Sequence, residues 1–331
     1  MKNKIYLLFL TSVLTIISSC KLNNSNIWID ENIEKNIKSD ISKLDQKILT
    51  AFINKDTSII KELTPSEIYK KNESQISKLM EINLDFFDSS NYKIINQFHI
   101  KSMNTGTINH VMTGKSDISD YSIQYLSLNK ETFISVIEPK QNLNSLLFVL
   151  IYGKYDKQWK LNSLKIGQYK LNNKNAPQLY EEAKKDFENL YLVDAANNIF
   201  LCEQVIEPAE NIFSYNRKEE MKKLKNEISN KIKETYTFPI TLDKIETRPK
   251  ILNIYPKGMS EGFYPMIEYL TIINLKDTIK TKNENLLIQK NIREVFKGID
   301  LNKKYIFYKA LNEIPDGTKQ IYSYGFVEEI K

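Results

Sequence analysis

The chain has 331 residues, of which 41% are hydrophobic and 27% are charged, so it can bury a sizeable core and is long enough for two or more domains. Its 47 basic and 41 acidic residues give a formal net charge of +6. Only Arg217, Arg248 and Arg293 are arginines, and lysines occur throughout the chain, so no basic stripe carries the bidentate arginine forks that favour nucleic-acid binding. We therefore predict no nucleic-acid partner.

The first twenty residues have the pattern of an export signal. Two lysines precede an apolar run, residues 5–17, whose thirteen residues are too few to cross a hydrocarbon core about 30 Å thick. The segment "ISSC" at residues 17–20 resembles the lipobox of bacterial lipoproteins. This resemblance implies that residues 1–19 are a signal peptide and that Cys20 becomes the lipid-modified first residue of the mature protein.

A polar tether follows Cys20. Its six residues, "KLNNSN", reach at most about 20 Å, so we expect residues 20–26 to hold the folded part close to a membrane of the cell envelope. In a Gram-negative host, Lys21 differs from the aspartate associated with inner-membrane retention, which favours the periplasmic face of the outer membrane. The other cysteine, Cys202, lies in an apolar helical run, and we expect a small buried side chain without chemistry.

The folded part begins with helix patterns. Hydrophobic residues recur every three or four positions over residues 33–52, which predicts one long amphipathic helix. Residues 54–63 predict a short second helix. The segment "TPSE" at residues 64–67 matches a capping box with proline at the first helical position, so a third helix is expected to run toward Phe87.

Alternating hydrophobic patterns then predict a run of antiparallel strands. Turn clusters such as "DSSN", "MNTG" and "SDISD" separate these strands. Helices followed by antiparallel strands indicate an α+β fold. The six expected strands are residues 92–101, 108–114, 121–128, 132–138, 145–155 and 159–166.

Two segments carry a resemblance to a known family. "ILTAFINKDTSIIKEL", followed later by "LLFVLIYGKYDKQWKLNSLKIG", resembles the NTF2-like (SnoaL-like) superfamily, in which a curved antiparallel sheet wraps around a long helix to form a cone. The likeness is most specific at the last hairpin, where "YDKQWKL" places Trp159 just past a polar turn. It covers residues 27–170, concerns the fold alone and brings no catalytic motif.

A helical segment follows the expected NTF2-like domain. Residues 171–237 return to helical spacing, which predicts a helical hairpin. A third helix is expected from about Arg217 to Thr235, with apolar residues on one face.

Residues 238–331 are predicted to form a C-terminal antiparallel α+β domain. A long loop rich in proline and glycine, residues 255–265, separates its first two strands. A helix capped by Thr281 and Glu284 is expected to stop at Gly298. The expected strands are residues 250–255, 266–275, 303–311 and 320–329.

Gly258, Ser260 and Gly262 match the G-x-S-x-G pattern of a serine-hydrolase nucleophile elbow. An elbow needs a strand before the serine, a helix after it and, in α/β-hydrolases, a histidine later in the chain. Here the residues after Gly262 favour a strand, and both histidines lie upstream. We interpret the segment as a turn with two glycines, and as a candidate binding loop instead of a catalytic one.

The two histidines, His99 and His110, could form a pair. A turn centred between Asn104 and Thr105 would place them directly opposite each other, with Cβ atoms about 5 Å apart, where they could seat a metal ion. A three-residue loop ending in glycine would instead place Val111 opposite His99. Because no third ligand is identifiable, no metal is assigned.

No other motif indicates enzyme chemistry. The sequence lacks HExxH, a CxxC pair, a Walker loop and a GxGxxG after a strand, so no cofactor is expected. The aromatic residues at 305–308 and 322–326 favour cross-strand packing, with a sugar-stacking platform as the alternative.

The expected function is therefore binding. We expect an envelope lipoprotein that binds another envelope protein or a small ligand, through the cone or through the loop at residues 255–265. The alternative is an enzyme with its active site inside the cone. A deep cone with one inward acid or histidine would favour the enzyme, and a cone filled by Phe, Leu and Ile would favour the binder.

Overall fold

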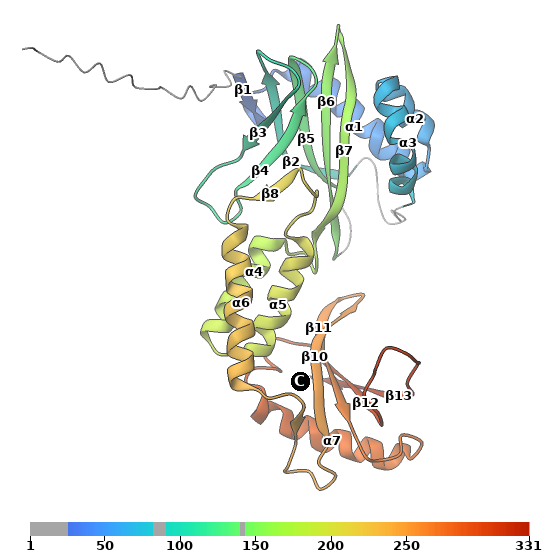
Figure 1. Cartoon of the computed structure of the whole chain (residues 1–331), viewed down its shortest axis with the longest axis vertical. Coiled ribbons are helices and arrows are strands. Elements are labelled where there is room, and N and C mark those ends of the chain that lie inside the picture. Colours follow the sequence, from blue (N-terminus) through green and yellow to red (C-terminus); the bar gives the residue numbers. More distant parts are fainter. Residues whose placement is uncertain (1–25, 82–90, 140–142, 331) are drawn as a thin grey trace, which may run out of the picture.

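The computed structural model describes residues 26–81, 91–139 and 143–330. Within these ranges the chain combines helices with largely antiparallel sheets, which confirms the predicted α+β class. Figure 1 shows an elongated molecule, with the N-terminal sheet at one end, helices α4 to α6 in the middle and the C-terminal sheet at the other end. Cys20 and the expected helix end at Phe87 lie outside the described residues.

The N-terminal sheet is antiparallel throughout, with strand order β1-β2-β5-β6-β7. Its centre is apolar on both faces, because successive side chains of a strand point to opposite sides. In β6, Phe148 and Leu150 pack into one core, and Leu147 and Val149 pack into the other. The strands are β1 (Asn26–Ile29), β2 (Tyr92–Lys101), β5 (Glu131–Pro139), β6 (Ser145–Tyr155) and β7 (Gln158–Lys170).

Three helices pack against one face of this sheet. The first is the long amphipathic helix that the sequence predicts, with Ile41 and Phe52 on its buried side. The expected capping box of the third helix does not form, because the helix begins one residue later than the pattern requires. Pro65 occupies the N-cap position, and the Thr64 hydroxyl makes no cap hydrogen bond. The helices are α1 (Lys35–Asn54), α2 (Thr57–Leu63) and α3 (Ser66–Met80).

A second sheet, with strand order β3-β4-β8, packs against the other face. The hairpin between residues 92–101 and 108–114, which both registers considered for His99 and His110 require, does not form. Both sides of β2 are already occupied, by β1 and by β5, so β3 pairs with β4 instead. The strands are β3 (Thr107–Met112), β4 (Tyr121–Ser127) and β8 (Phe213–Tyr215).

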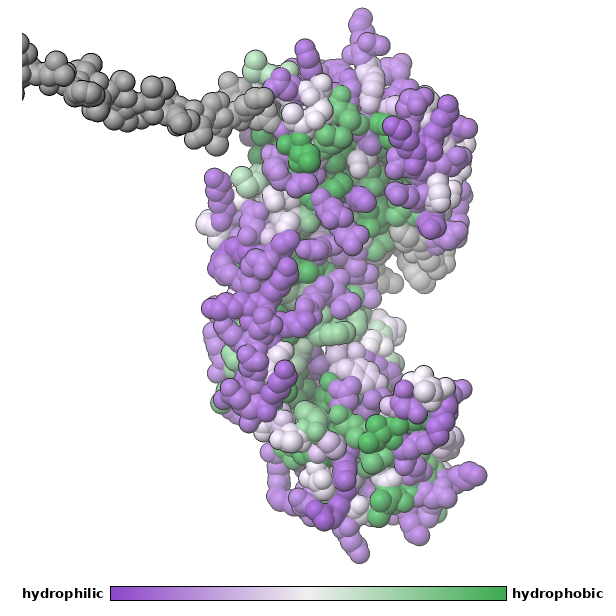
Figure 2. All heavy atoms as spheres, in the orientation of Figure 1, coloured by the Kyte–Doolittle hydropathy of each residue, from purple (hydrophilic) through white to green (hydrophobic). Residues whose placement is uncertain are grey.

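The helices in the middle of the molecule share a core with the N-terminal sheet and with the β3-β4-β8 sheet. One hydrophobic cluster contains residues of these helices and of both sheets, so it crosses the domain boundary that was expected at residue 170. The outer face of α6 is covered by hydrophilic side chains (Figure 2), while Met221 and Ile228 on its inner face are buried. The helices are α4 (Ala176–Glu188), α5 (Leu192–Val205) and α6 (Lys218–Thr235).

The C-terminal sheet has the strand order β13-β12-β11-β10-β9. The prediction of an antiparallel sheet is wrong for one pair: β11 and β12 are parallel, because α7 connects them as a crossover helix. α7 also starts earlier than predicted, with Asp277 as its N-cap, so Thr281 and Glu284 lie buried inside the helix. The elements are β9 (Ile240–Thr241), β10 (Lys250–Met259), β11 (Gly262–Leu270), α7 (Thr278–Val295), β12 (Tyr305–Leu311) and β13 (Ser323–Glu329).

The expected loop at residues 255–265 is instead the tip of a β-hairpin. β10 and β11 continue through it and leave a two-residue turn at residues 260–261. Pro256 and Pro265 lie opposite each other in these strands. In the described part of the chain no third strand pairs with either proline, so the N–H that proline lacks is not needed for a hydrogen bond on the outer side.

Candidate functional site

Ser260 lies at the exposed tip of the β10–β11 hairpin. A strand follows it, and not the helix that a nucleophile elbow requires. Gly258 lies in β10 opposite Phe263, and Gly262 begins β11. The Ser260 hydroxyl lies 2.9 Å from Oε2 of Glu261, and both histidines belong to other sheets. This geometry gives Ser260 no histidine base.

His99 and His110 lie in different sheets, so neither register expected from the sequence forms. His99 is buried in β2 opposite Phe133, and its Nε2 lies 2.9 Å from Oε1 of Glu131. Burial lowers the pKa of His99 below its ordinary value, and the hydrogen bond to Glu131 opposes that change. His110 is exposed in β3 opposite Gln124. Across the described ranges, no three His, Cys, Asp or Glu side chains gather as a metal site requires.

The N-terminal core contains a buried acid that the sequence did not single out. Asp45 of α1 accepts hydrogen bonds from the Tyr152 hydroxyl at 2.6 Å and the Ser135 hydroxyl at 2.9 Å. Burial raises its pKa to about 6, because the charged form loses its hydration, and the two hydrogen bonds lower it. Apolar side chains such as Phe133 and Phe148 fill the surrounding core.

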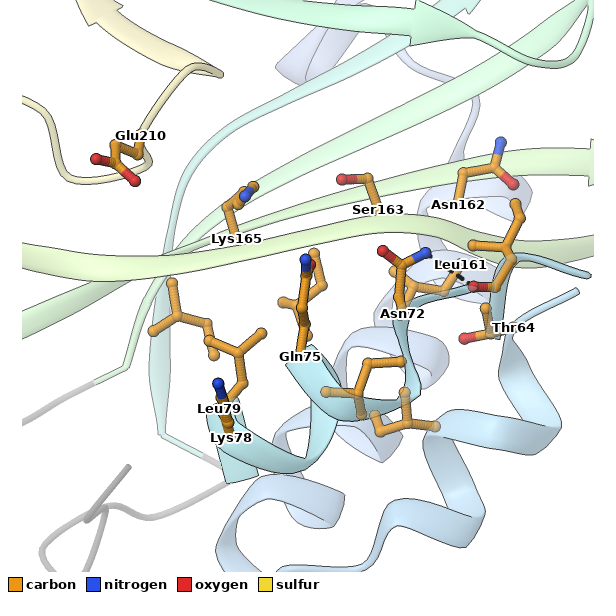
Figure 3. A pocket seen from close by; sticks show the side chains of 15 residues that line it. Thr64, Asn72, Gln75, Lys78, Leu79, Leu161, Asn162, Ser163, Lys165 and Glu210 are labelled. Atoms are coloured by element: carbon orange, nitrogen blue, oxygen red, sulfur yellow. Dashed lines mark hydrogen bonds between the residues drawn. The ribbon is translucent and has the colours of Figure 1, made fainter. Parts of the chain in front are cut away.

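A groove with a volume of about 430 Å³ runs between α3 and β7 (Figure 3). On the helix side, the amides of Asn72 and Gln75 point toward β7. On the strand side, six consecutive residues, 161–166, line the groove. Because side chains alternate between the faces of a strand, six consecutive residues line one groove only where it follows the strand edge.

The sequence of α3 explains its polar wall. Tyr69 and Ile76 are buried toward the core, whereas positions 72 and 75, three residues apart, share the helix side that faces β7. Thr64, just before α3, also lines the groove. The residue is only 5% exposed, and its hydroxyl has no hydrogen-bond partner among the described residues. A buried hydroxyl without a hydrogen-bond partner lowers the stability of a protein by about 1–3 kcal/mol. A polar ligand group that reached Thr64 from the groove could therefore form a hydrogen bond that the hydroxyl lacks.

β7 is an edge strand. In the described parts of the chain it pairs only with β6. The outward N–H and C=O groups of residues 161–166 therefore have no neighbouring strand, and such an edge is a template for an added one. The pairing shifts register between Ile151 and Tyr152, opposite this same part of β7.

The charged side chains of the groove lie at its margins. Lys78 comes from α3 and Lys165 from β7. Glu210 lies on the loop before β8, across β7 from α3 (Figure 3). Two cations and one anion leave one net positive charge, which favours an uncharged or mildly acidic ligand.

None of the candidate site residues predicted from the sequence lines this groove. Cys202 is buried, as predicted, and burial raises its pKa to about 12. The sequence does contain a signal that β7 is an edge strand. It is the last strand of an antiparallel run and is followed by helices, and it carries Lys160, Lys165 and Lys170, which are charged residues typical of edge strands.

Comparison of the chain with protein-family models, with curated proteins and with solved structures finds no match. Within residues 26–81, 91–139 and 143–330, no helix has both the length and the apolar character needed to cross a bilayer. Geometry and chemistry alone therefore define the site.

Proposed function

We propose that this protein is an envelope lipoprotein, anchored through Cys20, that binds an extended segment of another protein along the edge of β7. The pattern at residues 17–20 supports the anchor. β1 begins at Asn26, six residues after Cys20, so the tether leads directly into the N-terminal sheet. In a Gram-negative host, the periplasmic face of the outer membrane is the proposed location.

We also infer that residues 27–170 form an NTF2-like domain. The packing of α1, α2 and α3 against one face of a five-stranded antiparallel sheet supports this assignment. The β3-β4-β8 sheet on the other face is an addition to that arrangement.

Strand addition is the binding mode that the groove favours. A segment beside β7 would continue the sheet through main-chain hydrogen bonds, and α3 would flank it on the other side. The Thr64 hydroxyl and the amides of Asn72 and Gln75 would meet polar groups of the segment. One observation carries the proposal: six consecutive residues of β7, whose outer edge has no neighbouring strand among the described residues, form one wall of the groove.

The alternative, an enzyme inside the cone, has one candidate acid in Asp45. Both carboxylate oxygens of Asp45 already accept hydrogen bonds, and apolar side chains fill the core around it. These contacts favour a structural role for the acid, so binding is the function proposed.

The anchor is tested by replacing Cys20. Cys20→Ser should abolish incorporation of radiolabelled palmitate and move the protein from the membrane fraction to the soluble fraction. Cys202→Ala is the matched control, because the Cys202 thiol is buried and should leave labelling unchanged. Unchanged labelling of Cys20→Ser would contradict the proposed anchor.

The groove is tested with peptides selected from a random phage-displayed library against the purified protein. Gln75→Trp places a large ring in the groove and should weaken binding of the selected peptides at least tenfold, which is about 1.4 kcal/mol. Glu73→Trp is the matched control, since Glu73 is exposed on α3 outside the groove. Equal affinity of the parent and Gln75→Trp proteins would reject this site.

A further inference from the structure

A second cavity lies between the helices in the middle of the molecule and the C-terminal sheet. Its volume is about 370 Å³, within the range of small-ligand sites. α4 and α5 form one wall, and the β10–β11 hairpin with residues 301–303 forms the other. Figure 1 shows the hairpin rising beside α5, which β10 contacts. This cleft shares no residue with the α3–β7 groove.

The charges of the cleft are balanced internally. It contains three lysines and three carboxylates. The Lys303 ammonium lies 2.6 Å from Oδ2 of Asp194, in a pair whose side chains are only 14% and 13% exposed. Lys174 lies 2.6 Å from Oε2 of Glu182. A strongly charged ligand would have to break these pairs, so the cleft favours a neutral one.

Several amide side chains line the same cleft. The Asn198 amide donates to Asp186 at 2.8 Å, which fixes its orientation. Each amide both donates and accepts, which suits hydroxyl groups that do the same. The five asparagines that line the cleft are Asn172, Asn189, Asn197, Asn198 and Asn302.

Aromatic rings complete the lining. Phe263 and Tyr264 of β11 lie on one wall and Tyr191 lies on the other. The Tyr264 ring packs edge-on against Tyr305, with centroids 5.3 Å apart, which holds it in place on the sheet. A half-buried ring offers a flat apolar face next to polar groups, and the C–H faces of a sugar ring match such a surface.

We propose that this cleft binds a neutral oligosaccharide. Paired charges, donor-acceptor amides and fixed aromatic faces fit a ligand that is uncharged, rich in hydroxyls and partly apolar. Tyr305 belongs to the aromatic strands for which a sugar platform was one interpretation of the sequence. The site is independent of the peptide groove and of the lipid anchor.

The test is isothermal titration of the purified protein with maltotetraose, cellotetraose and chitotetraose, and with tetragalacturonate as the anionic comparison. At least one neutral tetrasaccharide should bind. Tyr264→Ala should weaken it at least tenfold, and Asn197→Ala at least threefold. Tyr322→Ala, an exposed aromatic outside the cleft, and Gln75→Trp, in the groove, should leave its affinity unchanged.

Circular dichroism and thermal unfolding check that each variant folds. Asn197→Ala decides the test if Tyr264→Ala does not fold, because alanine is favourable at this helical position. The proposal is overturned if none of the three neutral sugars binds at millimolar concentration. It is also overturned if tetragalacturonate binds most tightly, or if the cleft variants bind like the parent.

Discussion

Asp45 provides a quantitative test of the N-terminal core. Its carboxyl is fully buried between α1 and the sheet, and its pKa is raised from 3.8 to about 6, chiefly by burial. Since one pKa unit is worth about 1.36 kcal/mol, the folded protein binds this proton about 3 kcal/mol more favourably than the unfolded chain. Asp45 should therefore contribute to the dependence of the free energy of unfolding on pH.

The sign follows from the raised pKa. The folded state takes up the proton first as the pH falls, so the contribution is fully present below about pH 3.8 and is lost as the pH rises through about 6. Between pH 7.5 and pH 5.0, Asp45 alone should add about 1.4 kcal/mol to the free energy of unfolding.

Asp45→Asn removes this titration and keeps an oxygen that accepts from Tyr152 or Ser135. Urea unfolding of both proteins at the two pH values gives the difference, in which the contributions of other titrating groups such as His99 cancel. The parent should gain about 1.4 kcal/mol more than Asp45→Asn on going to pH 5.0.

Asp40→Asn is the matched control, because Asp40 lies on the same helix with its side chain 63% exposed. It should show the same pH dependence as the parent. An identical pH dependence of the parent and Asp45→Asn would refute the reasoning, since the acid would then not be buried in the folded state.

Other substitutions test particular contacts. Thr64→Val should raise the free energy of unfolding by about 1 kcal/mol in thermal unfolding, because it removes a buried hydroxyl without a partner among the described residues. Thr281→Val should lower the free energy of unfolding by about 1 kcal/mol, because the Thr281 hydroxyl donates to the Asp277 carbonyl. Gly167→Ala should cost about 1–3 kcal/mol, since a Cβ would lie 2.0 Å from the Pro208 carbonyl oxygen, and Gly325→Ala, with room for a methyl, should change stability little. Cys202 should react with a thiol reagent only after unfolding, because its thiol is buried with a pKa of about 12. These assignments would be contradicted if the two threonine variants, or the two glycine variants, changed stability equally. Fast reaction of Cys202 with the thiol reagent in the folded protein would also contradict them.

Local patterns predicted most elements of the fold. Strands β2 and β6 have the bounds expected from alternation, residues 92–101 and 145–155, and α1 and α6 follow the helical spacing closely. The helices α1 and α6 each bury one continuous face, and the strands β2 and β6 bury residues on both faces, so the sequences of these elements carry the information.

Pairing between distant strands could not be predicted in the same way. The sequence around residues 99–110 is compatible with a hairpin, but the competition of β1 and β5 for β2 decides the register. The parallel pair β11–β12 likewise depends on how α7 packs. The groove combines α3 with β7, which are about 80 residues apart, so a local pattern can indicate that β7 is an edge strand but not that α3 lies beside it.

The most direct test of strand addition is hydrogen exchange of the backbone amides with and without a selected peptide. Binding along β7 should slow exchange within residues 161–166 and leave exchange unchanged in β13, an edge strand of the C-terminal sheet. A bound peptide that leaves exchange in β7 unchanged would contradict the proposed binding mode.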